Sequence, residues 1–162
     1  MKIYKNFLSK QDFKKIKKQL MGVNMPWYWS EGVVHPFARE PISNFQFVYV
    51  LILNSKQNCH PDMINLLNPI ISKLKFKQMR KIKANLVPCT PKIIEHGMHA
   101  DKKVGRTGIF YLNTCNGYTI FEDGTKIMSE ENKYIEFKSK LKHTGSSCTD
   151  KKRRIVINFN YV

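Results

Sequence analysis

The hydrophobic positions in the first half of the chain predict two amphipathic helices. In residues 9–21 the hydrophobic positions fall on one face of a helix. Ser9, at the start of this segment, is a residue type that caps helix N-termini well. In residues 61–74 apolar side chains again recur every three or four positions. Pro69 falls inside this second pattern, so we expect the helix to be kinked there or divided, with Asn68 capping a second short piece.

A different pattern predicts β-structure in most of the remaining chain. Residues 45–53 are rich in β-branched and aromatic side chains, which indicates a buried strand. From residue 80 onward, short alternating runs are separated by Gly, Pro and Asp-Gly turn signals. These runs are residues 81–87, 98–101, 107–113, 118–122, 126–128, 134–137, 141–144 and 154–161. Strands at this spacing are typical of a sandwich or barrel.

We therefore expect one mostly β domain over residues 1–162, with N-terminal helices packed against it. Residues 1–79 would form a helical and aromatic support region, and residues 80–162 the β core. A chain of 162 residues is long enough to form a stable hydrophobic core without disulfides or structural metal ions. Residues 26–29 (Pro-Trp-Tyr-Trp) are expected to pack in that core, or alternatively to form the wall of a cleft.

The net charge of +16 favours acidic partners, which include nucleic acid, acidic proteins and anionic small molecules. The basic residues cluster in residues 14–18, 73–83 and 138–154. The simplest interpretation is a solvated lysine-rich surface, because the sequence carries no nucleic-acid-binding motif. Nucleic acid stays open as a partner on charge alone.

The cellular setting is expected to be cytoplasmic. The N-terminus lacks the apolar segment and cleavage site of a signal peptide. The longest apolar run, residues 47–53, is too short to cross a membrane. The four cysteines form no CxxC pair, and we expect them to be reduced thiols.

His99, Asp101 and His143 are the candidate metal ligands. On an extended strand, side chains at positions i and i+2 point to the same face, so His99 and Asp101 would converge on one ion. His143 would come from a neighbouring strand. Two imidazoles and one carboxylate suit a divalent iron that keeps coordination positions open for other ligands.

Arg154 is the candidate anion-binding residue. It opens an apolar strand, and its planar guanidinium matches a carboxylate. The strand period places Arg154, Val156, Asn158 and Asn160 on one face, with the apolar residues between them on the other. The same period turns Arg153 outward, so we prefer Arg154 for this role.

The C-terminal half resembles the Fe(II)- and 2-oxoglutarate-dependent oxygenases of the prolyl-4-hydroxylase-like branch, including its small stand-alone viral members. The segments that carry the resemblance are EHGMHAD at residues 95–101, GIFYLN at 108–113, NGYTIF at 116–121, FKS at 137–139, KHTG at 142–145 and RIVINFNY at 154–161. The resemblance covers residues 80–162 and implies a double-stranded β-helix, a distorted jelly roll.

The resemblance also implies a role for individual residues. His99, Asp101 and His143 match the iron ligands, and Arg154 matches the residue that pairs with the distal carboxylate of 2-oxoglutarate. Tyr111 matches a tyrosine that binds the same carboxylate, although its position also suits a core residue. Asn158 matches a further polar contact to the cosubstrate. The implied cofactors are Fe(II), 2-oxoglutarate and O2, with ascorbate stimulatory.

The implied activity is a dioxygenase that hydroxylates a substrate C–H bond, plausibly in a peptidyl proline or another side chain, with succinate and CO2 as coproducts. The alternatives are oxidation of nucleic acid or of a small molecule, and a non-catalytic binding module. Nucleic-acid demethylases of this family carry a second arginine where this chain has Asn160. His96 is expected to be an exposed loop residue, with a substrate-facing role as the alternative. His35 and His60 lie outside the resembling region and receive no role.

Overall fold

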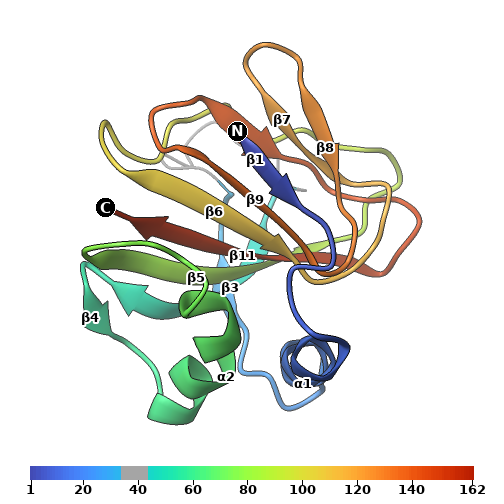
Figure 1. The fold of residues 1–162 in the computed structure, drawn as a ribbon. Helices are drawn as coiled ribbons and strands as arrows, with labels where there is room; N and C mark the ends of the chain where they lie inside the picture. Colours follow the sequence, from blue (N-terminus) through green and yellow to red (C-terminus); the bar gives the residue numbers. More distant parts are fainter. Residues whose placement is uncertain (34–43) are drawn as a thin grey trace.

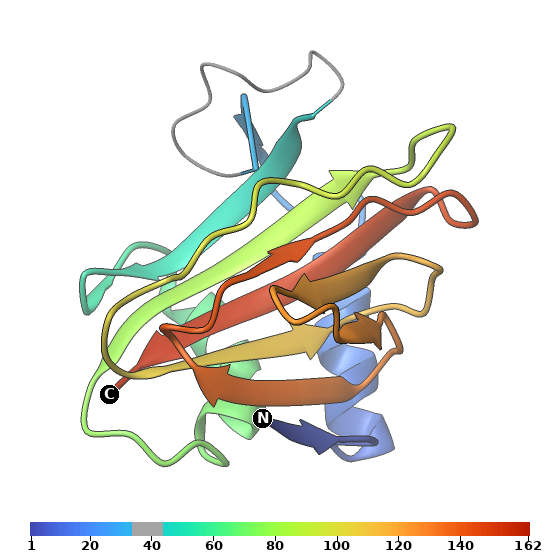
Figure 2. The ribbon, with the colours of Figure 1, turned by 90° about the horizontal axis from the view of Figure 1, so that it is seen from above.

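The structure is a computed structural model that describes residues 1–33 and 44–162. These residues form two β-sheets, one of eight strands and one of three. The helices α1 (Lys10–Leu20) and α2 (Pro61–Ile71) lie below the larger sheet (Figure 1). Seen from above, the three-stranded sheet lies over the larger one (Figure 2). The molecule is therefore mostly β, in three layers of small sheet, large sheet and helices.

The larger sheet combines strands from both halves of the chain. Its order is β1-β9-β6-β11-β5-β3-β2, with β4 paired to β3, and the smaller sheet has the order β10-β7-β8. Both sheets are antiparallel. The strands are β1 (Lys2–Tyr4), β2 (Tyr28–Ser30), β3 (Gln46–Leu53), β4 (Lys56–Gln57), β5 (Met79–Pro88), β6 (Arg106–Tyr111), β7 (Tyr118–Phe121), β8 (Lys126–Met128), β9 (Lys133–Lys138), β10 (His143–Gly145) and β11 (Arg153–Tyr161). The first half of the chain thus supplies strands of the main sheet as well as helices.

The central strand β11 separates two apolar clusters by simple alternation. Ile155, Ile157 and Phe159 are fully buried in the cluster that the helices share with the larger sheet. Val156 belongs to a second cluster, whose other members come from β6, β7, β8 and β9. The predicted two faces of this strand are confirmed, because a strand period of two sends neighbouring side chains to opposite sides.

The helix that begins after Ser9 is confirmed, since the Ser9 side chain caps α1 by accepting a hydrogen bond from the Asp12 amide at 3.1 Å. Of the two outcomes predicted at Pro69, a kink or a division, the division is wrong, because α2 is one helix. Proline removes one helical hydrogen bond, but only two residues of α2 follow it. Leu67 and Ile70 on either side are fully buried, and their packing holds the helix together.

The strand predicted at residues 98–101 is also wrong. His99 forms an isolated bridge to His143, with backbone N–H to O distances of 3.0 and 2.8 Å. Two residues later the Asp101 amide bonds instead to the Ser139 carbonyl. Because the segment changes its hydrogen-bond partner within two residues, it does not form a continuous β-ladder. His99 and Asp101 therefore lie in a loop that is held by backbone hydrogen bonds at these two residues.

The aromatic residues at positions 26–29 do not all pack in the core. Trp27 packs against the main cluster, as expected. Tyr28 and Trp29 lie on β2, at the edge of the larger sheet, and are 63% and 57% exposed. The Trp29 ring stacks on Phe45, with 4.6 Å between ring centroids. The rings of Tyr28 and Trp29 are therefore not part of the core.

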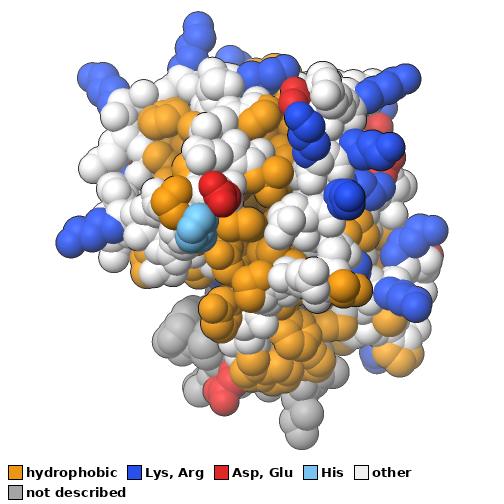
Figure 3. Space-filling model, turned by 90° about the horizontal axis from the view of Figure 1, so that it is seen from below, with side chains coloured by type: hydrophobic (Ala, Val, Ile, Leu, Met, Phe, Trp, Pro, Cys, Tyr) orange, Lys and Arg blue, Asp and Glu red, His pale blue; other side chains and the backbone are white. Residues whose placement is uncertain are grey.

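The basic residues are spread over the surface. On the face seen from below, Lys and Arg side chains project around the edge, and hydrophobic side chains gather across the middle (Figure 3). Several lysines form exposed ion pairs, including Lys17 with Glu131 and Lys142 with Glu122. Exposed pairs of this kind contribute little to stability. No helix in the described part of the chain is long and apolar enough to cross a membrane.

Candidate metal centre

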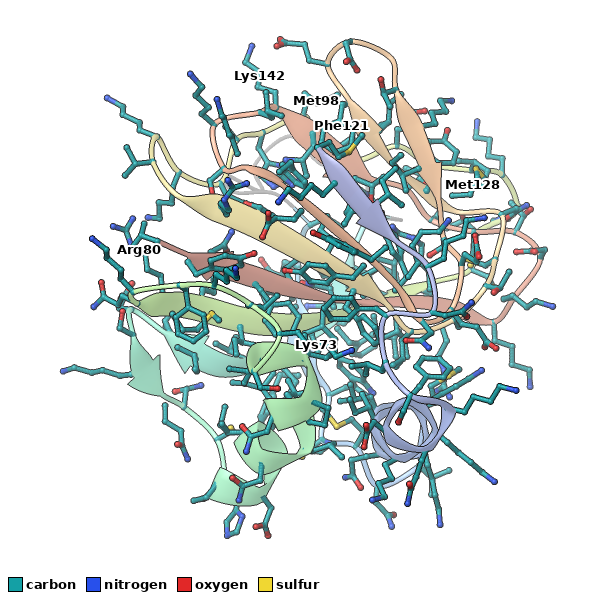
Figure 4. The ribbon with its side chains drawn as sticks, viewed as in Figure 1. Lys73, Arg80, Met98, Phe121, Met128 and Lys142 are labelled. Carbon is teal, nitrogen blue, oxygen red and sulfur yellow. The ribbon has the colours of Figure 1, made fainter. Side chains whose placement is uncertain are left out.

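His99, Asp101 and His143 lie together between the two sheets. Asp101 is 3.9 Å from His99 Nε2 through Oδ1, and 3.8 Å from His143 Nε2 through Oδ2. One ligand atom from each residue lies within 4.8 Å of the others. Met98 and Lys142, which precede the two histidines, are exposed and lie at the same upper end of the molecule (Figure 4). The three groups could therefore hold one metal ion just below the surface.

The backbone fixes the orientation of both imidazoles. Nδ1 of His99 lies 3.1 Å from the Gly97 carbonyl oxygen, and Nδ1 of His143 lies 3.0 Å from the Leu141 carbonyl oxygen. A ring nitrogen that donates to a carbonyl leaves the other nitrogen, Nε2, as the free lone pair. Histidine ligands in metal sites are oriented by such outer hydrogen bonds, so both Nε2 atoms are prepared to coordinate.

Two neighbours hold the Asp101 carboxylate. Thr107 Oγ1 donates to Asp101 Oδ2 at 2.5 Å, and Asn160 Nδ2 donates to the same oxygen at 3.0 Å. Asn160 also donates to Thr107 Oγ1, which closes a small network. In the sequence, Asn160 stands out only as a departure from a family pattern. Its position on the Arg154 face of β11 is the one sequence signal that it can reach the site.

The protonation of the candidate ligands suits a cation. Burial lowers the pKa of His143, and this outweighs the opposing effect of Asp101. Burial alone would raise the pKa of Asp101, but the hydrogen bond from Thr107, the charge of His143 and the hydrogen bond from Asn160 bring it below its usual value. A neutral imidazole and an ionised carboxylate are the forms that bind metal.

A small cavity of about 110 Å³, the central cavity, connects the three ligands with Arg154. Arg154 is 3% exposed, and its donors reach Ser129 Oγ and Thr119 Oγ1 at 3.2 Å each. Burial lowers its pKa. Among residues 1–33 and 44–162, no carboxylate forms an ion pair with it. A buried guanidinium without an anion is costly, so this end of the cavity is prepared for an anionic ligand.

Tyr111 contributes to this end of the cavity through Thr119. Its hydroxyl donates to Thr119 Oγ1 at 2.8 Å, and its ring lies 5.7 Å from the Arg154 guanidinium. Tyr111 is fully buried, which raises its pKa to about 12. Thr119 itself lines the cavity and accepts hydrogen bonds from Tyr111 and Arg154. Its own hydroxyl proton has no acceptor among the described residues and can point to a ligand. Sequence reasoning missed Thr119, because only the β7–β11 geometry brings it to Arg154.

The expectation that His96 is an exposed loop residue is wrong. His96 is 8% exposed and lines the central cavity, and neither ring nitrogen has a hydrogen-bond partner among the described residues. Burial and the nearby charge of Arg154 lower its pKa to about 4, so it is neutral at physiological pH. Asn158 also lines the cavity, and its buried Oδ1 has no partner within residues 1–33 and 44–162. His60 caps α2 at an exposed position, and His35 lies outside the described residues.

No protein-family model matches the chain. No curated protein matches it either. Solved structures do. A prolyl hydroxylase from Trichoplax adhaerens, in complex with a hypoxia inducible factor peptide fragment, matches with a TM-score of 0.64 and 15% identity, over 99% of this chain and 82% of that one. A prolyl-4-hydroxylase from Pseudomonas putida matches with a TM-score of 0.60 and 13% identity, over 99% and 91%.

A third similar structure is the α-ketoglutarate-dependent carbocyclase SnoK of nogalamycin biosynthesis. It matches with a TM-score of 0.68 and 11% identity, over 98% of this chain and 78% of that one. The chain therefore has the fold of the 2-oxoglutarate- and Fe(II)-dependent oxygenases. The similar structures with this fold include prolyl hydroxylases, which match the chain over nearly its whole length.

Proposed function

We propose that the protein is an Fe(II)- and 2-oxoglutarate-dependent dioxygenase built on a double-stranded β-helix. The observation that carries this proposal is the pairing of two features in one cavity. His99, Asp101 and His143 converge at one end. The buried Arg154, which has no carboxylate partner among the described residues, lies at the other. A metal centre alone would fit many functions. Arg154, which can bind a carboxylate, favours a cosubstrate that reaches from the metal to its guanidinium group.

The residues present fit these groups. His99, Asp101 and His143 would hold Fe(II), and Arg154 would bind the distal carboxylate of 2-oxoglutarate. Thr119 and, behind it, Tyr111 would support that carboxylate, while Asn158 offers a further polar contact. When bound, iron, 2-oxoglutarate and O2 supply the oxidising chemistry, with succinate and CO2 as coproducts. The protein orients these groups and excludes water.

The proposed substrate is a peptidyl side chain, with proline as the first candidate. The Trichoplax adhaerens relative is a prolyl hydroxylase bound to a peptide, which supports a peptide substrate by analogy of fold. Asn160, where nucleic-acid demethylases carry an arginine, is used here to hold Asp101. This use of Asn160 disfavours oxidation of nucleic acid. The alternatives to a peptide hydroxylase are oxidation of nucleic acid, oxidation of a small molecule, and a non-catalytic binding role. We expect a cytoplasmic setting.

The direct test is succinate release from 2-oxoglutarate by the purified protein with Fe(II), O2 and ascorbate. Turnover should rise when the correct substrate is added from a panel of proline-containing peptides, oligonucleotides and amino acids. Stimulation by an oligonucleotide would reverse the order of the substrate candidates. A protein that binds neither Fe(II) nor Mn(II) would instead be a binding module.

Removing the hydroxyl that holds Asp101 is expected to weaken metal binding. Thr107→Val keeps the size and shape of the side chain but deletes the 2.5 Å hydrogen bond. Loss of such an outer contact lowers metal affinity by about 10- to 100-fold. Titration of the metal-free protein with Mn(II), followed by electron paramagnetic resonance, measures this directly. Thr125→Val, in the exposed turn after β7, is the matched control, and equal affinity in both variants would contradict the role of Thr107.

A further inference from the structure

Two lysines of β5 line the central cavity beside the candidate metal ligands. Lys81 and Lys83 lie directly across from Asn160 and Asn158 of β11. The residue between them, Ile82, is fully buried on the opposite, helix-facing side of the sheet. The strand period therefore directs both lysines inward toward the cavity, and we call them the lysine pair. By contrast, Arg80 lies at the outer end of β5 and does not line the cavity (Figure 4).

The lysine pair has no anionic partner of its own in the described part of the chain. Neither ammonium group makes a hydrogen bond or ion pair within residues 1–33 and 44–162. Lys83 is half-buried, and burial together with the charge of Lys81 lowers its pKa to about 8, against the opposing effect of Asp101. Among the described residues that line the cavity, Asp101 is the one carboxylate. If Asp101 coordinates a metal, these residues leave the lysine pair without a counter-charge.

The lysine pair and Arg154 occupy different ends of the cavity. Arg154 pairs with Val87, four positions from Lys83 along β5. At about 3.3 Å per residue, the two backbone positions are separated by roughly 13 Å. Arg154 can thus hold the cosubstrate carboxylate without the lysine pair, which lies at the metal end. That end is where the reacting part of a substrate has to sit.

The charges of the loaded cavity favour an anion at this place. Fe(II) and 2-oxoglutarate cancel one another's formal charge, and Asp101 cancels one of the three basic side chains. A formal excess of about two positive charges remains in a partly dry site, where electrostatic interactions are stronger than in water. A compact anionic group beside the lysine pair would offset this excess.

We propose that the lysine pair binds the carboxylate of an acidic side chain in the peptide substrate, next to the C–H bond that is oxidised. This inference rests on the proposed function and adds a substrate class to it. Asn85, two positions from Lys83 on the same face of β5, also lines the cavity and offers a further hydrogen bond. The lysine pair would select Asp- or Glu-containing peptides over peptides with the matching amides.

The test compares peptide pairs that differ only in Asp against Asn, or Glu against Gln, next to a proline. Binding is measured by calorimetry to protein loaded with Mn(II) and 2-oxoglutarate in the absence of oxygen. We expect the acidic peptide to bind about ten- to hundredfold tighter, as for a charge-assisted contact. Lys83→Met should abolish this preference and Lys83→Arg should retain part of it. Arg80→Met, which removes one charge outside the cavity, should leave the preference intact.

Three results would overturn the inference. The first is equal binding of acidic and amide peptides to the wild-type protein. The second is a preference that survives in both Lys83→Met and Lys81→Met, each shown to be folded by thermal unfolding. The third is an oligonucleotide that binds through Lys83 while acidic peptides do not bind. Each of these results would refute only the role of the lysine pair, provided that the wild-type protein still converts 2-oxoglutarate. If the wild-type protein neither bound nor converted 2-oxoglutarate, the proposed dioxygenase function would be refuted instead.

Discussion

Replacing His99 or His143 with alanine is expected to abolish Fe(II) binding and succinate formation from 2-oxoglutarate. Each histidine supplies one of the three ligand atoms that lie within 4.8 Å of one another. With one imidazole removed, the remaining pair cannot fix an ion with the same geometry. Mn(II) binding by electron paramagnetic resonance and a succinate assay measure the two effects separately.

The matched control for these variants is His60→Asn. His60 is exposed and caps α2, and asparagine preserves the capping role because its side-chain oxygen also accepts a backbone hydrogen bond. This variant should bind metal and turn over 2-oxoglutarate like the wild type. His99 is partly exposed, so we expect His99→Ala to remain folded, which thermal unfolding would check. Full activity in either alanine variant would disprove the assignment of the metal centre.

The features that could be predicted from sequence are those that depend on local periodicity. The α1 cap at Ser9 and the alternation of β11 follow from neighbouring residues alone, because cap chemistry and strand period are local properties. The alternation is also what placed Arg154 and Asn158 in the cavity. Choosing Arg154 over Arg153 required nothing beyond the phase of this strand.

The features that could not be predicted depend on contacts between distant segments. His99 and Asp101 converge without a strand, because a backbone bridge to His143 and a bond to Ser139 hold their loop. Thr119 reaches Arg154 only because the two sheets pack against one another and bring β7 next to β11. The burial of His96 likewise follows from its backbone hydrogen bond to Gly145 rather than from its own sequence surroundings. Such pairings over long sequence separations leave no local pattern.

Replacing Arg154 with alanine is expected to raise the apparent KM for 2-oxoglutarate by about ten- to hundredfold. This corresponds to the loss of a charge-assisted hydrogen bond, worth about 1.5–3 kcal/mol. Metal binding should be unchanged, since Arg154 lies at the other end of the cavity from the three ligands. Calorimetric titration of the Mn(II)-loaded variant with 2-oxoglutarate, alongside steady-state succinate kinetics, measures the loss.

Arg153→Ala is the matched control, because it removes the same side chain from the next position of β11. Arg153 points to the opposite side and donates to the Met21 carbonyl oxygen at the end of α1. Its loss should cost some stability and leave 2-oxoglutarate affinity unchanged. If Arg153→Ala weakened 2-oxoglutarate binding and Arg154→Ala did not, the cosubstrate carboxylate would lie on the Arg153 face of β11. Arg154 and Asn158 are both assigned to the cavity by the same strand phase, so this result would refute both proposed cosubstrate contacts.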